Sequence, residues 1–409
     1  MKNRNKLRIS YLIIAALFVF SCENQKRTEI INSERTNPNI LFIAIDDLRP
    51  ELQVYIASHI KSPAIDQLAS QSLVFDRAYC NIPVCGTSRA SLLSGIRPGR
   101  HRFIGYSTYL DEDYPGVTSL PKHFKNNGYT TISNGKITDK TIQDLKELKE
   151  KRESFFMAVG FIKPHLPFNA PAKYWDLYDS PKISLPENYL QSETTPKEAF
   201  HNSVELRHYS GVPKKGPVSE ELANKLIHSY YASVSYTDAQ IGKILAALQE
   251  LELDENTVII LWGDHGWNLG DHQLWCKHCN FESSLHVPLM LKVPGQTSGK
   301  HTTALAEYID IYPSLSELAG LSIPEHTDGE SFVPLINGMN RSKDFAISKF
   351  NDGITLVKGE LFYTEWLDKE DNVKAKMLFD HSKDPLELNN FAESPEFAEK
   401  SKGVKYIPT

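Results

Sequence analysis

The sequence has no excess of positive charge, no internal repeat and only five cysteines. A formal net charge of −6 argues against a nucleic-acid binder, which is usually basic. It leaves room for an anionic substrate, because local cations and a metal can reverse the field in one cleft. One C-x-x-C pair, Cys276 and Cys279, has no second pair, which argues against a zinc site. The composition, 41% hydrophobic and 23% charged, is ordinary for a globular protein, and the length of 409 residues suggests one large domain and a smaller one.

The N-terminus has the pattern of a targeting segment, and no run in it is long enough to span a bilayer. A basic start precedes the short apolar stretch Tyr11–Phe20, and a small residue then stands directly before Cys22. We predict a lipoprotein-type signal peptide over residues 1–22, with lipid on Cys22, and a polar tether over residues 23–37. An ordinary secretory signal is the alternative. Both place the mature protein outside the cytoplasm, and the lipid anchor predicts the periplasm, outer membrane or cell surface of a bacterium.

Four apolar runs have the length and the β-branched content of strands buried on both faces. They are Asn39–Ile45, Tyr129–Ser133, Phe155–Phe161 and Thr257–Trp262. Three intervening segments carry apolar residues at helical spacing. They are Pro63–Gln71, Ser119–Asn127 and Glu220–Leu251. Strands that alternate with helices predict an α/β fold with a largely parallel sheet covered on both sides.

Polar side chains follow these strands directly, where the site of a parallel sheet lies. The acidic groups come in two places, Asp46-Asp47 and Asp264-His265, and Lys136 and His165 follow two other strands. A polar residue after a strand is commonplace by itself. Crowded carboxylates, however, repel one another unless a cation lies among them. Such oxygen-rich ligation suits calcium or magnesium better than zinc.

Cys85 and Arg89 open a segment that is typical of a helix start. Backbone N–H groups at a helix start, together with a guanidinium, form an anion site, so a reactive residue there faces a bound oxyanion. The alternative is a buried cysteine without a chemical role.

Motifs in six places, in the same order along the chain, carry a family resemblance. They are Ile43–Pro50, Cys85–Gly95, Gly135-Lys136, Gly160–Phe168, Gly263–Trp267 and Leu274–Leu289. By these residues the chain resembles the type I (formylglycine-dependent) sulfatases of the alkaline phosphatase superfamily, most closely the iduronate-2-sulfatase-like group.

The resemblance implies a role for each of these residues. Cys85 would be oxidised to formylglycine by a maturation enzyme, and Arg89 would orient the aldehyde hydrate that attacks sulfur. Lys136 and Lys277 would clamp the sulfate oxygens, and His165 would protonate the leaving alcohol. A calcium ion would be held by five residues: Asp46, Asp47, Cys85, Asp264 and His265.

The family fold implies two parts after the tether. A catalytic domain with a large mixed sheet would cover residues 38–329, and a subdomain with a small antiparallel sheet and one helix would cover residues 330–409. Trp267 is a candidate for stacking on a sugar, and Arg102 for pairing with a uronate carboxylate. The alternatives are packing for Trp267 and a solvated surface charge for Arg102.

The chain departs from the family pattern at three places. Thr87 stands where the maturation motif has proline or alanine, Asp139 stands where relatives carry histidine, and residues 137–152 are shorter than the substrate-shaping loop of many relatives. A disulfide between Cys276 and Cys279 would stiffen Lys277.

Together these features predict an exported sulfatase that acts on a sulfated oligo- or polysaccharide, including a sulfated uronate as one candidate. The first alternative is a phosphomonoester, phosphodiester or phosphonate hydrolase of the same superfamily. The second is a surface glycan-binding lipoprotein whose site is degenerate.

Overall fold

The structure is a computed structural model that describes residues 37–135, 138–179 and 183–395. Its main element is a seven-stranded sheet with the order β10-β2-β9-β6-β1-β5-β4. In that order the strands are Lys300–Thr302, Leu73–Phe75, Leu289–Lys292, Thr257–Gly263, Asn39–Ile45, Phe155–Phe161 and Thr130–Gly135. Neighbouring pairs among β4, β5, β1 and β6 are parallel, whereas β9 runs antiparallel to both β6 and β2. The predicted mixed, mostly parallel sheet is therefore confirmed.

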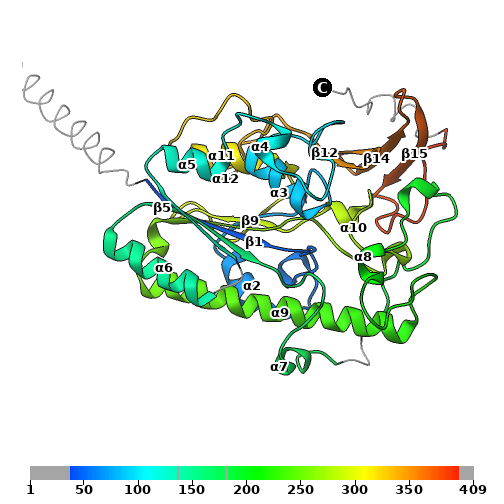
Figure 1. Ribbon diagram of the computed structural model, residues 1–409, viewed down its shortest axis with the longest axis horizontal. Helices are drawn as coiled ribbons and strands as arrows, with labels where there is room; N and C mark the ends of the chain where they lie inside the picture. The colour runs from blue at the N-terminus through cyan, green and yellow to red at the C-terminus, as the bar shows by residue number, and fades with distance from the viewer. Residues whose placement is uncertain (1–36, 136–137, 180–182, 396–409) are drawn as a thin grey trace, which may run out of the picture. The chain divides into compact units, whose positions relative to one another are not determined.

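The central strands are apolar throughout because helices cover both faces of the sheet. Every residue of β6 is buried, and so is every residue of β1 except Ala44. Three helices cover one face: α2 (Pro63–Ala69), α6 (Thr138–Lys151) and α9 (Glu220–Glu250) (Figure 1). Three others cover the opposite face: α3 (Cys85–Ser94), α5 (Leu120–Asn126) and α11 (Ile311–Leu318) (Figure 1).

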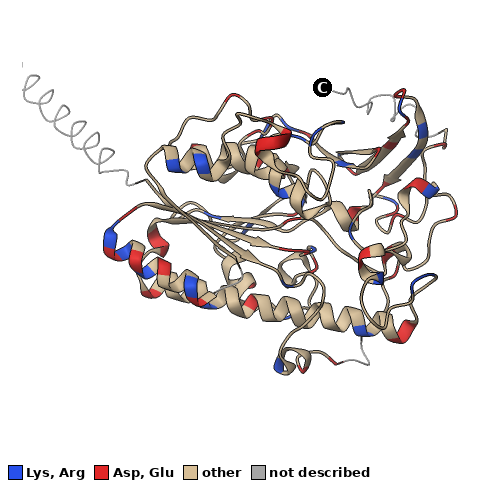
Figure 2. Ribbon diagram, viewed as in Figure 1, with Lys and Arg blue, Asp and Glu red and all other residues tan. Residues whose placement is uncertain are grey.

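The longest helix, α9, begins where the sequence predicts it. The Ser219 side chain accepts a hydrogen bond from the Leu222 N–H at 3.3 Å, which satisfies one of the donors that a helix start leaves free. The helices predicted over Pro63–Gln71 and Ser119–Asn127 are also present, each shorter than predicted by two residues. Charges of both signs lie along α6 and α9, while the sheet is mostly uncharged (Figure 2).

Five further helices have four residues each. They are α4 (Leu110–Asp113), α7 (Ala172–Trp175), α8 (Val204–Arg207), α10 (Glu282–Leu285) and α12 (Val333–Ile336). Two pairs of very short strands complete the connections. They are β3 (Ala78–Tyr79) with β11 (Ala306–Glu307) and β7 (Asn268–Leu269) with β8 (Trp275–Cys276).

The predicted small antiparallel sheet is also present, as a four-stranded meander. Its strands, each paired with the next, are β12 (Phe345–Phe350), β13 (Gly353–Lys358), β14 (Leu361–Leu367) and β15 (Val373–Asp380). Phe362, Trp366 and Phe379 of this sheet belong to the same buried core as Phe42 of β1. The boundary at residue 330 stays a prediction, because the chain from Asn39 onward packs as one unit.

The predicted signal peptide, Cys22 and all of the tether except Asn37 lie outside the described residues. Among the residues that are described, no helix has both the length and the apolar character needed to cross a membrane.

Candidate active site

Three neighbouring parallel strands end at the same edge of the sheet and bring the predicted acidic groups together. Ile45 of β1 lies opposite Phe161 of β5 on one side and Gly263 of β6 on the other. The pairing continues past the strand ends, since the Asp46 N–H donates to the Phe161 carbonyl at 2.9 Å. The Asp264 N–H likewise donates to the Ile45 carbonyl at 3.1 Å. The register of the sheet thus fixes the backbone beneath the candidate site.

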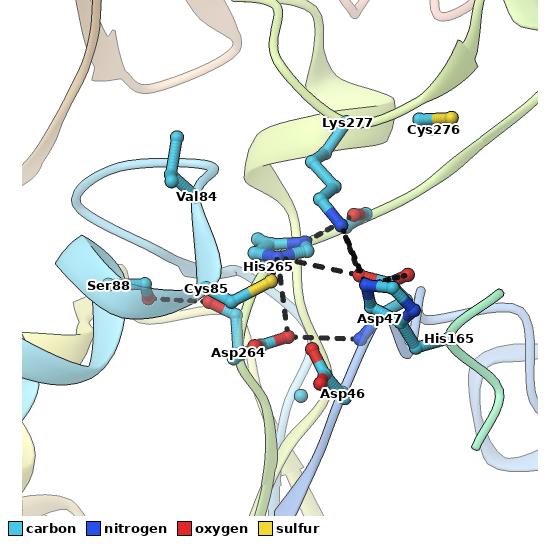
Figure 3. A network of polar contacts seen from close by, with 12 residues as sticks. Asp46, Asp47, Val84, Cys85, Ser88, His165, Asp264, His265, Cys276 and Lys277 are labelled. Atoms are coloured by element: carbon cyan, nitrogen blue, oxygen red, sulfur yellow. Dashed lines mark hydrogen bonds and ion pairs between the residues drawn. The ribbon is translucent and has the colours of Figure 1, made fainter. Parts of the chain in front are cut away.

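Four side chains from three segments form a group that could hold a metal ion. One ligand atom from each lies within 4.8 Å of all the others, and the residues are Asp46, Asp47, Cys85 and His265. The Cys85 Sγ is 3.1 Å from His265 Nε2, which in turn is 3.5 Å from Asp47 Oδ1 (Figure 3). Cys85 comes from the first turn of α3, so the sheet and this helix meet at the site.

The donor set fits a hard cation. Asp46 Oδ1 and Asp47 Oδ2 are buried and, in the described part of the chain, have no hydrogen-bond partner. Burial raises the pKa of Asp46 to about 7, with a further contribution from Asp264, and burial also raises the pKa of Asp47. A cation among these oxygens would stabilise the ionised carboxylates and so offset the effect of burial on their pKa. His265 Nδ1 is 2.9 Å from the Gly266 carbonyl, an arrangement typical of a histidine whose Nε2 is kept for a metal.

Asp264 lies at the edge of this group and is held as a carboxylate. Its Oδ1 accepts from the Asp47 N–H at 3.0 Å, and its Oδ2 is 3.0 Å from an Arg89 guanidinium nitrogen. The same nitrogen is 3.3 Å from Asp46 Oδ2. Burial alone would raise the pKa of Asp264, but His265 and Arg89 outweigh burial and lower it far below its usual range. Arg89 therefore links helix α3 to the acidic residues that follow strands β1 and β6.

The Cys85 thiol is not activated as a thiolate in this setting. Burial, followed by the nearby Asp264 carboxylate, raises its pKa far above the ordinary value. A cysteine nucleophile normally requires the opposite shift. The surroundings of Cys85 therefore do not favour a thiolate nucleophile.

Lys277 reaches the site from the segment before α10 and lies at the centre of a second group of ligand-type atoms (Figure 3). This group consists of Asp47, His165 and Glu205. The Lys277 Nζ is 3.1 Å from Asp47 Oδ1, 2.9 Å from Glu205 Oε1 and 3.4 Å from His165 Nε2. Its ammonium therefore occupies the place that a second metal ion would take.

Three residues in or beside these groups have a strained backbone. Asp47, Cys276 and His278 have φ values of 61°, 73° and 77°, in the left-handed region that residues with a side chain seldom adopt. The last two flank Lys277. Such strain persists only where the surroundings impose it, and it is enriched at functional sites.

Glu205 is a residue of the site that the sequence did not reveal. It lies on the one-turn helix α8, and its Oε1 is also 3.1 Å from His165 Nε2. No strand end or motif precedes it. Only its position after folding shows that one carboxylate oxygen joins His165 and Lys277.

The structure gives different outcomes for the two proposed substrate contacts, Trp267 and Arg102. Trp267 is 1% exposed, and its ring packs beneath the Lys277 Nζ at 4.8 Å and against Phe168 at 6.1 Å. Stacking of Trp267 on a sugar is therefore a wrong prediction, because the ring is covered. Arg102 donates to the Arg97 carbonyl at 3.1 Å and lies over the Tyr114 ring, and its pairing with a uronate stays a prediction.

Four other predictions concern neighbouring positions. Lys136 lies outside the described residues, so its role stays a prediction. Asp139 is exposed at the start of α6. The Cys276–Cys279 disulfide is not formed, since both thiols are free. Thr87 is buried in the first turn of α3, where its hydroxyl donates to the Val84 carbonyl at 3.0 Å.

The sheet edge carries carboxylates, a lysine and a helix N-terminus, a set of groups suited to binding a cation together with an anionic ester. A sequence model of the family described as "Sulfatase" matches residues 38–139 and 132–321. Iduronate 2-sulfatase of Mus musculus is 30% identical over 421 residues, covering 80% of this chain and 76% of that protein. The chain therefore belongs to the sulfatase family and is a sulfuric ester hydrolase.

Two solved structures share the fold. BT4656 in complex with its substrate D-glucosamine-2-N,6-O-disulfate has a TM-score of 0.79 at 18% identity, covering 90% of this chain and 96% of that chain. The phosphonate monoester hydrolase of Agrobacterium radiobacter has a TM-score of 0.76 at 20% identity, covering 90% and 94%. At these identities the two structures show the shared fold alone.

Proposed function

We propose that the protein removes sulfate from sulfated carbohydrate, using Cys85 in its formylglycine form and one calcium ion. The observation that carries this proposal is the position of Cys85 Sγ among the ligand atoms of Asp46, Asp47 and His265 at the start of helix α3. These residues and Asp264 would hold the ion. When present, the ion supplies positive charge for the sulfate oxygens, and the aldehyde hydrate supplies the hydroxyl that attacks sulfur.

The surrounding residues would bind the sulfate and move the proton. Arg89, fixed by Asp264 and Asp46, holds the side chain of residue 85 in place. Lys277 holds a sulfate oxygen, and Lys136 is proposed to do the same. His165 protonates the leaving oxygen, because a sugar alkoxide is a poor leaving group. Its Nδ1 is 2.7 Å from the Leu166 carbonyl, which leaves Nε2 facing the site.

The position of Lys277 favours this reaction over that of the two-metal phosphatases. Asp47, His165 and Glu205 could hold a second ion, but the Lys277 ammonium already neutralises them. A formylglycine-dependent phosphonate hydrolase is the second candidate, since a phosphonate monoester hydrolase has the same fold. The sugar substrate is supported by the relatives that act on iduronate 2-sulfate and on a glucosamine disulfate.

The test compares matched esters. Purified protein is given a panel of sulfated monosaccharides and oligosaccharides, together with 4-nitrophenyl sulfate and a phenylphosphonate monoester, and C85A is the control. We expect sulfate release with a higher kcat/KM than phosphonate hydrolysis, and no release by C85A. A higher kcat/KM for the phosphonate, or full activity of C85A, would contradict the proposal.

We further propose export and lipidation of Cys22, which follow from the N-terminal sequence alone. Labelling of the wild type with a radioactive fatty acid, and none of C22A, is the expected result. Equal labelling of the two proteins, or none of either, would contradict the anchor.

A further inference from the structure

An unusual group of exposed apolar side chains lies on one segment beside the candidate active site. Among the described residues, Ile104, Tyr106, Tyr109 and Tyr114 are all large and solvent-exposed, and they lie between helices α3 and α5, on either side of the short helix α4. Tyr106 is 71% exposed. Exposed aromatic rings close to a reacting centre are typical of ligand recognition, because their faces are apolar while the tyrosine hydroxyl remains polar.

Tyr106 differs from the other three in its contact with the catalytic segments. Its hydroxyl oxygen is 3.2 Å from His278 Nε2, and the two rings meet edge to face with centroids 5.3 Å apart. His278 directly follows Lys277. His278 is itself stacked on Phe350 of β12, with centroids 5.7 Å apart. The Tyr106 ring therefore packs against His278, which directly follows Lys277, the proposed sulfate-binding lysine.

The backbone of Tyr106 also approaches the residue that follows Cys85. A Cβ atom placed on Gly86 would lie 2.7 Å from the Tyr106 carbonyl oxygen, so only glycine allows this approach. Tyr106 thus lies between the segments that carry Cys85 and Lys277.

We propose that the exposed face of Tyr106 is the stacking surface for the sugar ring whose sulfate ester is cleaved. This inference rests on the proposed function. In the proposed function sulfur lies next to Cys85 and the ester oxygen next to His165, so the ring that carries the ester extends from this buried group toward the exposed side chains beside it. A pyranose ring presents apolar C–H groups on its faces, and a flat aromatic ring complements them. Trp267 cannot serve, since it is covered.

The test uses four proteins: the wild type, Tyr106→Ala, Tyr106→Phe and Tyr109→Ala. Tyr109 is the matched control, because it is 63% exposed on the same segment but has no described contact with His278. Steady-state kinetics are measured on the sulfated sugar that the wild type prefers. Inhibition by inorganic sulfate, which has no ring, reports on the anion site alone.

We expect Tyr106→Ala to raise KM for the sugar about fivefold to twentyfold, the range of one lost aromatic contact. Tyr106→Phe keeps the ring and should stay within about threefold of the wild type, as should Tyr109→Ala. The inhibition constant of inorganic sulfate should be equal in all four proteins.

Three results would overturn the inference while leaving the proposed function in place. They are an unchanged KM in Tyr106→Ala, an equal loss in Tyr106→Phe, and an equal weakening of inorganic sulfate. The second would assign the effect to the hydroxyl bond with His278, and the third to a displaced Lys277. A wild type that releases sulfate from no sugar would instead contradict the proposed function, and this inference with it.

Discussion

Replacing Glu205 with glutamine should shift the pH dependence of the reaction, because the Glu205 carboxylate is hydrogen-bonded to His165, the proposed general acid. Burial alone would lower the pKa of His165, but the hydrogen bond from its Nε2 to Glu205 and the Asp47 charge outweigh burial and raise the pKa to about 9. Burial would likewise raise the pKa of Glu205, but His165 and Lys277 outweigh it and lower the pKa to about 2. His165 and Glu205 therefore carry opposite charges over a wide pH range.

The direction of the shift follows from the role of His165. An acid acts while it is protonated, so a pKa of about 9 keeps His165 competent up to that pH. A hydrogen bond to a charged group contributes about 1.5–3 kcal/mol, and one pKa unit corresponds to about 1.4 kcal/mol. Glutamine keeps the shape but not the charge. The alkaline limb of the pH–kcat profile should therefore move about one pH unit or more toward neutral.

The assay records pH–rate profiles of the wild type, Glu205→Gln and Glu193→Gln on two esters. Glu193 is an exposed glutamate on the same connection and serves as the control. A sugar sulfate needs its leaving oxygen protonated, whereas the nitrophenolate of 4-nitrophenyl sulfate leaves without help. Because a pKa lowered by one to two units leaves less His165 protonated, we expect Glu205→Gln to lose about 2-fold to 10-fold near pH 8 on the sugar sulfate and to change little on the aryl ester. Equal losses on both esters, or an unmoved alkaline limb, would refute the reasoning.

Three further predictions follow from the same geometry. Chelation of calcium should abolish activity and lower Tm by a few degrees, since Asp46 and Asp47 then repel each other; activity and Tm that are insensitive to a chelator would contradict a metal site. Thr87→Pro should fold normally, because position 87 lies in the first turn of α3, where the backbone N–H makes no hydrogen bond within the helix. The substitution should raise the fraction of Cys85 converted to aldehyde, measured from the mass of the peptide. A lower fraction would show that threonine suits the maturation enzyme. Trp267→Ala should cost about 3–5 kcal/mol of unfolding free energy by denaturant titration, as expected for a buried ring, whereas unchanged stability with a much higher KM would restore its role in sugar stacking.

The fold and the acidic core of the site could be predicted because they follow from local patterns. Unbroken apolar runs such as Asn39–Ile45 identify strands covered on both faces, and parallel strands must end at one edge. The polar groups that follow directly, Asp46-Asp47 and Asp264-His265, are therefore neighbours in space. Strand β9 was not predicted, because four residues carry too little periodicity to identify a strand.

The outer parts of the site could not be predicted from such patterns. Glu205 reaches His165 through a connection without a regular period, so only folding reveals the contact. Trp267 follows the strand-end motif directly, yet the sequence does not show whether its ring faces the cleft or the core. Tyr106 was overlooked for the converse reason, since it belongs to no motif. Its importance comes from its approach to Gly86 and His278.

The most direct test of the account is the mass of the peptide that contains residue 85, isolated from the catalytically active protein. The account predicts an aldehyde, or its hydrate, in place of the Cys85 thiol. A free thiol at this position in protein that hydrolyses sulfate esters at its full rate would contradict it.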